Sequence, residues 1–305
     1  MTGARSYDSP TAFRRALTDR LKAMAETSRW TLQQLQRQMA YDRLLERLYL
    51  VDEGWVVKGA TALLARDIGV RTTIDIDVYR EAAREVAEAD LREGAARDIG
   101  DWFRFEIGAP QAVSDAAGGA RFPVTASIGT TVWVAFHVDL VGSDLRMTGK
   151  PEDVPPLARV VMPDVDQHGY RAYPLVDHIA DKVAAMFELH GERSTPSTRY
   201  KDLVDLVAIV IAAPLDAEPQ MIAIRSEAER RGISLPARFA VPDRDLWERG
   251  YAAEAARSLL PVARTLLPVA RTLDEALAIV APFLDPLLDG TAEGAWRPAD
   301  GRWSA

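Results

Sequence analysis

The spacing of apolar residues along the chain changes from helical to strand-like in the first eighty positions. Apolar side chains recur every three or four positions over residues 10–26 and 29–50, which predicts two amphipathic helices. Residues 54–59 form a short apolar run that ends in glycine, and residues 60–66 return to helical spacing. Strict alternation over residues 73–79 then predicts a β-strand.

The pattern continues with one exposed helix and three more strands. Residues 81–98 are rich in Ala, Glu and Arg and predict the helix. The strands are expected at residues 102–107, 121–128 and 131–141, with Gly129 at the turn of a hairpin. Prolines between positions 151 and 163 then indicate a linker.

From the linker to about residue 288 the chain is again helical in pattern. We therefore expect an α+β fold, in which a small mixed sheet is flanked by N-terminal helices and a C-terminal helical domain. The expected divisions are N-terminal helices at 1–50, a sheet-containing core at 51–165, a helical domain at 166–290 and a loose tail at 291–305.

Composition narrows the chemistry. The chain has 305 residues, no cysteine and a formal net charge of -8, so disulfides, thiolate metal sites and cysteine nucleophiles are excluded. No apolar stretch is long enough for a membrane span and the N-terminus has no apolar signal region, so we expect a cytoplasmic protein with no membrane partner. The four histidines, at positions 137, 168, 178 and 190, lack the spacing of a zinc hydrolase site.

Positive charge is concentrated in the first fifty residues, despite the acidic balance of the whole chain. Two interpretations remain open: solvated helix faces, or a surface that meets nucleic-acid phosphates. The basic residues are Arg5, Arg14, Arg15, Arg20, Lys22, Arg29, Arg37, Arg43 and Arg47.

The strand predicted at 73–79 carries the most informative polar residues. Alternation places Thr73, Asp75 and Asp77 on one face and the apolar residues on the other. Aspartate is disfavoured in strands, and neighbouring carboxylates repel unless a cation offsets their charge. The pair is therefore a candidate metal site, although a solvated edge strand is the alternative.

The same alternation rule applies to residues 131–141. It predicts an apolar face made of Val132, Val134, Phe136, Val138 and Leu140, with Trp133, His137 and Asp139 on the opposite face. Asp139 is thus a candidate third carboxylate. Carboxylate ligands without cysteine suit Mg²⁺ or Mn²⁺.

A strand-to-helix turn precedes the acidic strand. Its residues are Lys58, Gly59, Ala60 and Thr61. A turn of this kind can present backbone N–H groups to a triphosphate, but by itself it is a common structural feature.

Several of these segments together resemble one enzyme group. The run KGATALLARDIGVRTTIDIDVY resembles the glycine motif and the Asp-x-Asp motif of polymerase β-like nucleotidyltransferases, in the form found in AbiEii and MenT toxins. Further along, YPLVDHIADKVAAMFE and YKDLVDLVAIV resemble the lysine helix and the second acidic helix of that group, and WVAFHVDLV stands in place of the third acidic strand.

The resemblance implies a role for each matching residue. Asp75 and Asp77 would bind the metal and act in catalysis, with Asp139 as a further ligand. The positions that would contact the nucleotide are Lys58, Gly59, Ala60, Thr61, Arg71 and Thr73; in some relatives a partner kinase modifies the hydroxyl at the place of Thr73.

Two matching residues lie outside the predicted sheet. Lys182 and Asp205 would complete the catalytic set. From the residues alone, a structural alternative stays open for each: Lys182 as a lysine at the edge of an apolar stripe, and Asp205 as the structural partner of Lys182 or Arg199.

The implied reaction transfers a nucleoside monophosphate from a nucleoside triphosphate, often a pyrimidine one, to the 3′ end of tRNA. That addition would block aminoacylation and translation. The implied partners are tRNA and a cognate antitoxin protein. Two alternatives remain open: a nucleotidyltransferase acting on a small molecule or protein, and a non-catalytic nucleotide-binding module.

Overall fold

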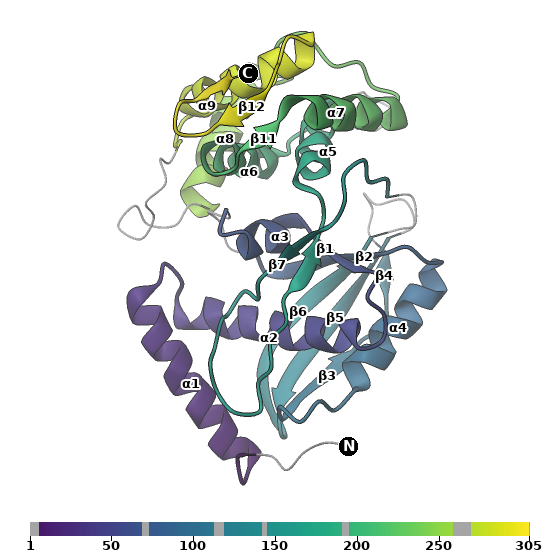
Figure 1. Cartoon of the computed structure of the whole chain (residues 1–305), viewed down its shortest axis with the longest axis vertical. Coiled ribbons are helices and arrows are strands. Elements are labelled where there is room, and N and C mark those ends of the chain that lie inside the picture. The colour runs from purple at the N-terminus through teal and green to yellow at the C-terminus, as the bar shows by residue number, and fades with distance from the viewer. Residues whose placement is uncertain are drawn as a thin grey trace. The chain divides into compact units, whose positions relative to one another are not determined.

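A computed structural model describes residues 6–68, 73–112, 119–141, 145–190, 195–258 and 270–304 (Figure 1). The chain divides into two compact units. The first comprises Met1–Arg66, Thr72–Arg146 and Glu152–Ala172, and the second comprises Asp67–Arg71, Met147–Pro151 and Tyr173–Ala305. The N-terminal helices thus belong to the same unit as the sheet.

The two predicted N-terminal helices are present and both are capped. Helix α1 spans Pro10–Thr27, with Ser9 accepting a hydrogen bond from the Ala12 N–H at 3.2 Å. Helix α2 spans Leu32–Tyr49, and Thr31 with Gln34 forms a reciprocal capping box at its start. These caps satisfy backbone groups that a helix start otherwise leaves unpaired.

The first unit is built on a mixed sheet. Within the described residues it has eight strands, in the order β3-β5-β6-β2-β1-β8-β7 with β4 pairing to β5. Their bounds are β1 Trp55–Lys58, β2 Asp75–Arg80, β3 Phe103–Ile107, β4 Gln111–Ala112, β5 Ala120–Ile128, β6 Thr131–Leu140, β7 Glu152–Val154 and β8 Tyr170–Ala172. Helices α3 (Gly59–Ala65) and α4 (Arg84–Ala96) complete the unit.

Strand β2 lies in the interior of the sheet. It runs parallel to β6, with Asp75 opposite His137 and Asp77 opposite Asp139, and antiparallel to β1, with Asp77 also opposite Lys58. The strand begins at Asp75, so Thr73 and Ile74 precede it, and the Ile74 side chain is 60% exposed. Strands β7 and β8 fall in or beyond the expected linker and were not anticipated.

The expected face assignment along β6 is wrong at one end. The pairing of β5 with β6 shifts by one residue at a β-bulge: Ala126 pairs with Val134 and Ser127 with Val132. Trp133 of β6 is the extra residue and has no partner in this ladder. Trp133 is buried; its ring contacts Phe103 edge-on and its indole N–H donates to the Gln36 carbonyl at 2.8 Å. Val132 is instead 57% exposed. Because a bulge adds one residue to one strand, it reverses the face of every residue beyond it.

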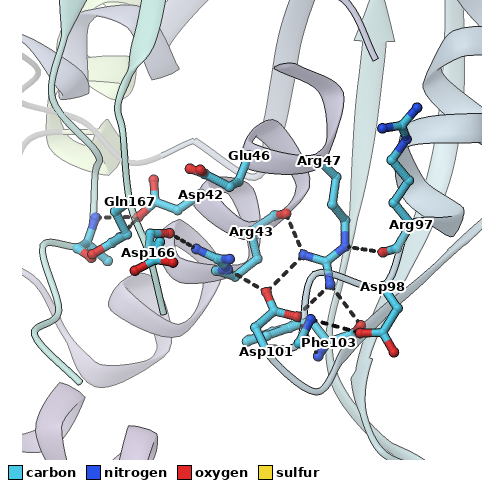
Figure 2. Close-up of polar contacts among 12 residues, drawn as sticks. Asp42, Arg43, Glu46, Arg47, Arg97, Asp98, Asp101, Phe103, Asp166 and Gln167 are labelled. Carbon is cyan, nitrogen blue, oxygen red and sulfur yellow. Dashed lines mark hydrogen bonds and ion pairs between the residues drawn. The ribbon is translucent and has the colours of Figure 1, made fainter. Parts of the chain in front are cut away.

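Helix α2 lies across one face of the sheet (Figure 1). Tyr41 of α2 packs edge-on against Phe136 of β6, with ring centroids 4.8 Å apart. Helix α2 also carries the buried Arg43 and Arg47, and both donate to the buried carboxylate of Asp101 (Figure 2). This arrangement fixes the helix to the turn that precedes β3.

Asp42, also on α2, holds the segment after β7. Its carboxylate accepts hydrogen bonds from the backbone N–H groups of Leu157 at 2.9 Å and Ala158 at 2.8 Å, and from the Gln167 amide at 3.3 Å. Burial raises the pKa of Asp42 from 3.8 to about 7, although these hydrogen bonds oppose the change.

This raised pKa gives the folding stability a definite pH dependence. Between about pH 4 and pH 7 the folded protein holds a proton on Asp42 that the unfolded chain has lost, so the contribution of Asp42 to stability falls as pH rises through that window. We expect the free energy of unfolding of Asp42→Asn, measured with urea at several pH values, to lack this decrease between about pH 4 and pH 7. An unchanged slope in the variant would contradict the assignment to Asp42.

The second unit is mainly helical, as expected. Its helices are α5 Leu175–Phe187, α6 Tyr200–Ala212, α7 Ala217–Arg231, α8 Arg244–Ser258 and α9 Leu273–Asp289, and its short strands are β9 Leu189–His190, β10 Thr195–Pro196, β11 Leu215–Asp216, β12 Ala295–Arg297 and β13 Arg302–Ser304. None of the helices, over the described part of the chain, is long and apolar enough to cross a membrane.

The tail expected to be loose is instead ordered. Strands β12 and β13 form a hairpin that pairs with β11. Trp296 is buried, donates its indole N–H to the Val210 carbonyl at 2.8 Å, and lies against Phe283 and Trp303. Three packed aromatic rings supply enough buried apolar area to order a short hairpin.

Candidate active site

The predicted carboxylates meet on one face of the sheet in the first unit. Asp75 and Asp77 are alternate residues of β2, and Asp139 lies opposite Asp77 on the parallel strand β6. Partners in a parallel ladder point to the same face. Asp75 and Asp139 are each partly buried, with 24% and 19% of the side chain exposed. The sheet therefore places all three carboxylates on one face.

Arg121 and His137 both contact this group. Arg121 of β5 donates to both oxygens of Asp139, at 2.7 and 2.6 Å, and reaches Asp75 Oδ2 at 3.3 Å. The Nδ1 atom of His137 lies 3.1 Å from Asp75 Oδ1. The hydrogen bonds to Asp139 are the main cause that raises the pKa of Arg121, so this guanidinium stays charged. Sequence reasoning did not identify Arg121.

Gly59 makes room for Asp77. Its φ is +58°, a conformation that favours glycine, and a Cβ atom built there would lie 1.9 Å from Asp77 Oδ2. The backbone at the start of α3 therefore approaches the carboxylate in a way that no other residue type permits. Ala60 and Thr61 follow, and both side chains are buried, so a ligand would meet their backbone.

Thr73 is turned toward its own backbone. Its hydroxyl donates to the Asp75 carbonyl at 2.8 Å and accepts from the Asp75 N–H at 3.3 Å, which fixes the entry into β2. Arg71, the other polar position expected before the acidic pair, lies outside the described residues.

A small cavity of about 10 Å³ lies beside Thr73. Tyr41 and Gln38 are among its lining residues, and within the described part of the chain the Tyr41 hydroxyl and Gln38 Oε1 are buried and have no hydrogen-bond partner. Burial, followed by the charges of Asp75 and Asp77, raises the pKa of Tyr41, so its hydroxyl remains protonated. The cavity lining comprises Gln34, Arg37, Gln38, Tyr41, Leu64 and Thr73.

The second unit contains a separate buried ionic cluster. Lys182 Nζ on α5 lies 2.8 Å from Asp202 Oδ1 and 2.8 Å from Asp205 Oδ2, both on α6. All three side chains are buried, and Arg199 also contacts Asp202, at 3.2 Å. The structural pairing weighed for Asp205 is thus present, and it holds the ammonium of Lys182 in place.

A family model now identifies the chain. The model described as nucleotidyl transferase AbiEii toxin, type IV toxin-antitoxin system, matches residues 43–279, which include the carboxylates of both units. The chain belongs to the AbiEii family. It is a nucleotidyltransferase, and its family is that of the toxin component of a toxin-antitoxin system.

Solved structures support the fold of this AbiEii protein. MenT4, a nucleotidyltransferase toxin from Mycobacterium tuberculosis, has 16% sequence identity and a TM-score of 0.53, over 90% of this chain and 89% of that one. JHP933 from Helicobacter pylori has 15% identity and a TM-score of 0.51, over 85% and 95%. No curated protein sequence matches the chain.

A divalent cation fits the acidic face of this AbiEii chain. The donors are carboxylate oxygens, which Mg²⁺ and Mn²⁺ prefer, and Gly59 leaves the Asp77 carboxylate uncovered by a side chain at that point. In the described part of the chain, however, no three potential ligands lie close enough together to form a ready metal cluster. Asp75 and Asp77, with Asp139 on the neighbouring strand, are the carboxylates that could hold such an ion.

Proposed function

We propose that this AbiEii protein transfers a nucleoside monophosphate from a nucleoside triphosphate to the 3′ end of tRNA, with Mg²⁺ or Mn²⁺ as the cofactor and a pyrimidine nucleotide preferred. Such an addition blocks aminoacylation and so stops translation. The observation that carries the proposal is the pair Asp75 and Asp77 on one face of an interior strand, with Gly59 shaped around Asp77.

The reaction forms one bond and breaks one. The terminal hydroxyl oxygen of the acceptor bonds to the α-phosphorus, the bond from the α-phosphorus to the bridging oxygen breaks, and pyrophosphate and a proton are released. The cation, when bound by Asp75 and Asp77, supplies charge stabilisation for the phosphates. The turn at Lys58 to Thr61 would bind phosphate oxygens through its backbone, since no side chain caps the start of α3.

Lys182 and Asp205 have proposed roles that follow from their place in the family match. Lys182 would bind the triphosphate as a point charge, and Asp205 would act by orienting it. The two 2.8 Å contacts from Asp202 and Asp205 support the orienting part of this proposal, because they fix the ammonium.

The structure limits which basic residues are available to tRNA. Arg14 donates to the Thr131 and Val132 carbonyls, and Arg20 donates to the Val161 and Ala16 carbonyls. With Arg43 and Arg47 bound to Asp101, four of the basic residues near the N-terminus serve the fold. A phosphate-facing surface would therefore rest on the others; of these, Arg15 and Lys22 are exposed, and Lys22 lies 3.9 Å from Asp19.

The test is incubation of the purified protein with total tRNA, Mg²⁺ and each labelled nucleoside triphosphate in turn. We expect label on tRNA from one nucleotide, its loss in Asp75→Ala, and its retention in Asp153→Ala, which removes an exposed aspartate of the same unit. Loss of transfer in both variants would point to misfolding. Label on a protein or a small molecule in place of tRNA would support the alternative acceptor classes.

The family also implies a cognate antitoxin as partner. We propose that the antitoxin acts on the acidic face, and that Thr73 is the residue on which a modifying antitoxin would act. A phosphate on Thr73 would bring negative charge next to Asp75 and oppose nucleotide binding. Mass spectrometry of toxin produced with and without its antitoxin would detect the modification.

A further inference from the structure

The bonds of Arg121 single out one of the three carboxylates. Its Nε and Nη2 atoms donate to the two oxygens of Asp139, at 2.7 and 2.6 Å, while its contact with Asp75 is a single one at 3.3 Å. Two parallel charge-assisted hydrogen bonds between a guanidinium and a carboxylate are strong and geometrically specific. Each Asp139 oxygen therefore already accepts a hydrogen bond from a cation of this chain.

The sheet register holds this pair together. Arg121 is directly opposite Asp139 in the β5–β6 ladder, on the far side of Asp139 from β2. A guanidinium there draws the Asp139 side chain away from Asp77, its neighbour on β2. To turn toward a metal ion on β2, Asp139 would have to weaken or give up these two hydrogen bonds, and Arg121 would keep only its single 3.3 Å contact with Asp75.

Charge balance points the same way. Three carboxylates on one face repel one another, and Arg121 offsets Asp139 most, through its two shorter bonds. Its longer contact and His137 partly offset Asp75. A divalent cation held through Asp75 and Asp77 would add positive charge to the same face. Consistently, the described residues include no group of three ligands arranged for a metal ion.

We propose that Arg121 withholds Asp139 from the metal, so that the divalent cation is bound by Asp75 and Asp77 without the third carboxylate. Arg121 is in this view a positioning residue. This inference rests on the proposed metal-dependent function and refines it, because it assigns the ligand set and makes metal affinity a property that Arg121 controls.

The test is Mn²⁺ binding to the full chain, without nucleotide, measured by electron paramagnetic resonance of the free ion. Four proteins form a double-mutant cycle: the unaltered chain, Arg121→Met, Asp139→Asn and the double variant. Arg104→Met is the matched control, since it removes an exposed arginine from β3 of the same sheet. Thermal unfolding of each variant shows that it is folded.

If Arg121 withholds Asp139, Asp139→Asn weakens binding by no more than about threefold in the unaltered chain, whereas Asp75→Asn weakens it by at least about a hundredfold. Arg121→Met tightens Mn²⁺ binding by about tenfold. Adding Asp139→Asn to Arg121→Met removes this gain, so Asp139→Asn weakens Mn²⁺ binding more in the Arg121→Met protein than in the unaltered chain. Arg104→Met leaves affinity within about twofold.

Two results would overturn the inference while leaving the proposed function intact. One is a loss of affinity in Asp139→Asn as large as in Asp75→Asn, which would make Asp139 a ligand in the unaltered protein. The other is strict additivity of the two substitutions, which would show that Arg121 acts only through its charge. Absence of Mn²⁺ binding by the unaltered chain would instead overturn both this inference and the metal dependence of the proposed function.

Discussion

Gly59→Ala is expected to lose at least about a hundredfold of its nucleotide-transfer rate, because a Cβ atom at this position would lie 1.9 Å from Asp77 Oδ2. Either the carboxylate or the start of α3 has to move, and both belong to the proposed nucleotide site. Mn²⁺ affinity should fall in parallel, since Asp77 is one of the two proposed ligands. Transfer of labelled nucleotide and Mn²⁺ titration measure the two effects.

Gly232→Ala separates the steric clash from backbone strain. Gly232 ends α7 with a φ of +64°, close to the +58° of Gly59, but a Cβ there would meet nothing within 4 Å. An alanine at either site bears the cost of the left-handed conformation, about 1–2 kcal/mol. Only Gly59→Ala should lose activity at a temperature where both variants are folded. Equal loss of activity in the two variants would refute the proposal that Gly59 is needed because it leaves room for the Asp77 carboxylate.

Much of the fold could be predicted from the sequence because the signals were local. Both N-terminal helices, the acidic strand and the β5–β6 hairpin follow from apolar spacing that holds over many residues. Strands β7 and β8 could not be predicted this way. Each has three residues, too few to show a period. They pair with each other across the expected linker, and β8 also pairs with β1, through Ala172 and Val57, which lie more than a hundred positions apart.

The candidate site was predictable only in part, for a related reason. Two carboxylates on alternate positions of one strand can be placed on a common face without further information. Arg121 cannot, because the β-bulge sets its partner. The hairpin turn pairs Ile128 with Thr131, and a regular ladder from that pair would place Arg121 opposite Val138, on the apolar face. The extra residue in β6 shifts the register by one, so that Arg121 lies opposite Asp139.

The ionic cluster of the second unit shows what a sequence pattern leaves open. The apolar surroundings of Asp205 indicated burial and therefore a partner, but two cations were available. The structure resolves the choice: Lys182 contacts both Asp202 and Asp205, while Arg199 contacts Asp202. The proposed role of Asp205 in orienting Lys182 and a structural role are compatible, because the Lys182–Asp205 contact serves both.

Asp101→Ala is expected to destabilise the first unit by about 3–5 kcal/mol, the cost of breaking a buried ion pair by removing one partner. Its carboxylate is fully buried and accepts hydrogen bonds from Arg43 and from Arg47, which has no exposed side-chain surface (Figure 2). Although burial opposes it, these hydrogen bonds and charges hold the pKa of Asp101 below its usual value. Without the carboxylate, two guanidinium groups remain in the interior. Urea unfolding measures the loss.

Glu93→Ala is the matched comparison, because it also removes a carboxylate that pairs with an arginine in the same unit. The Glu93–Arg97 pair is on the surface, with side chains 58% and 39% exposed, and its loss should cost no more than about 0.5 kcal/mol. A similar small cost in Asp101→Ala would mean that water reaches the arginines in the variant. The expected large difference instead follows from burial, since the attraction between charges and the penalty for leaving one unpaired both grow as water is excluded.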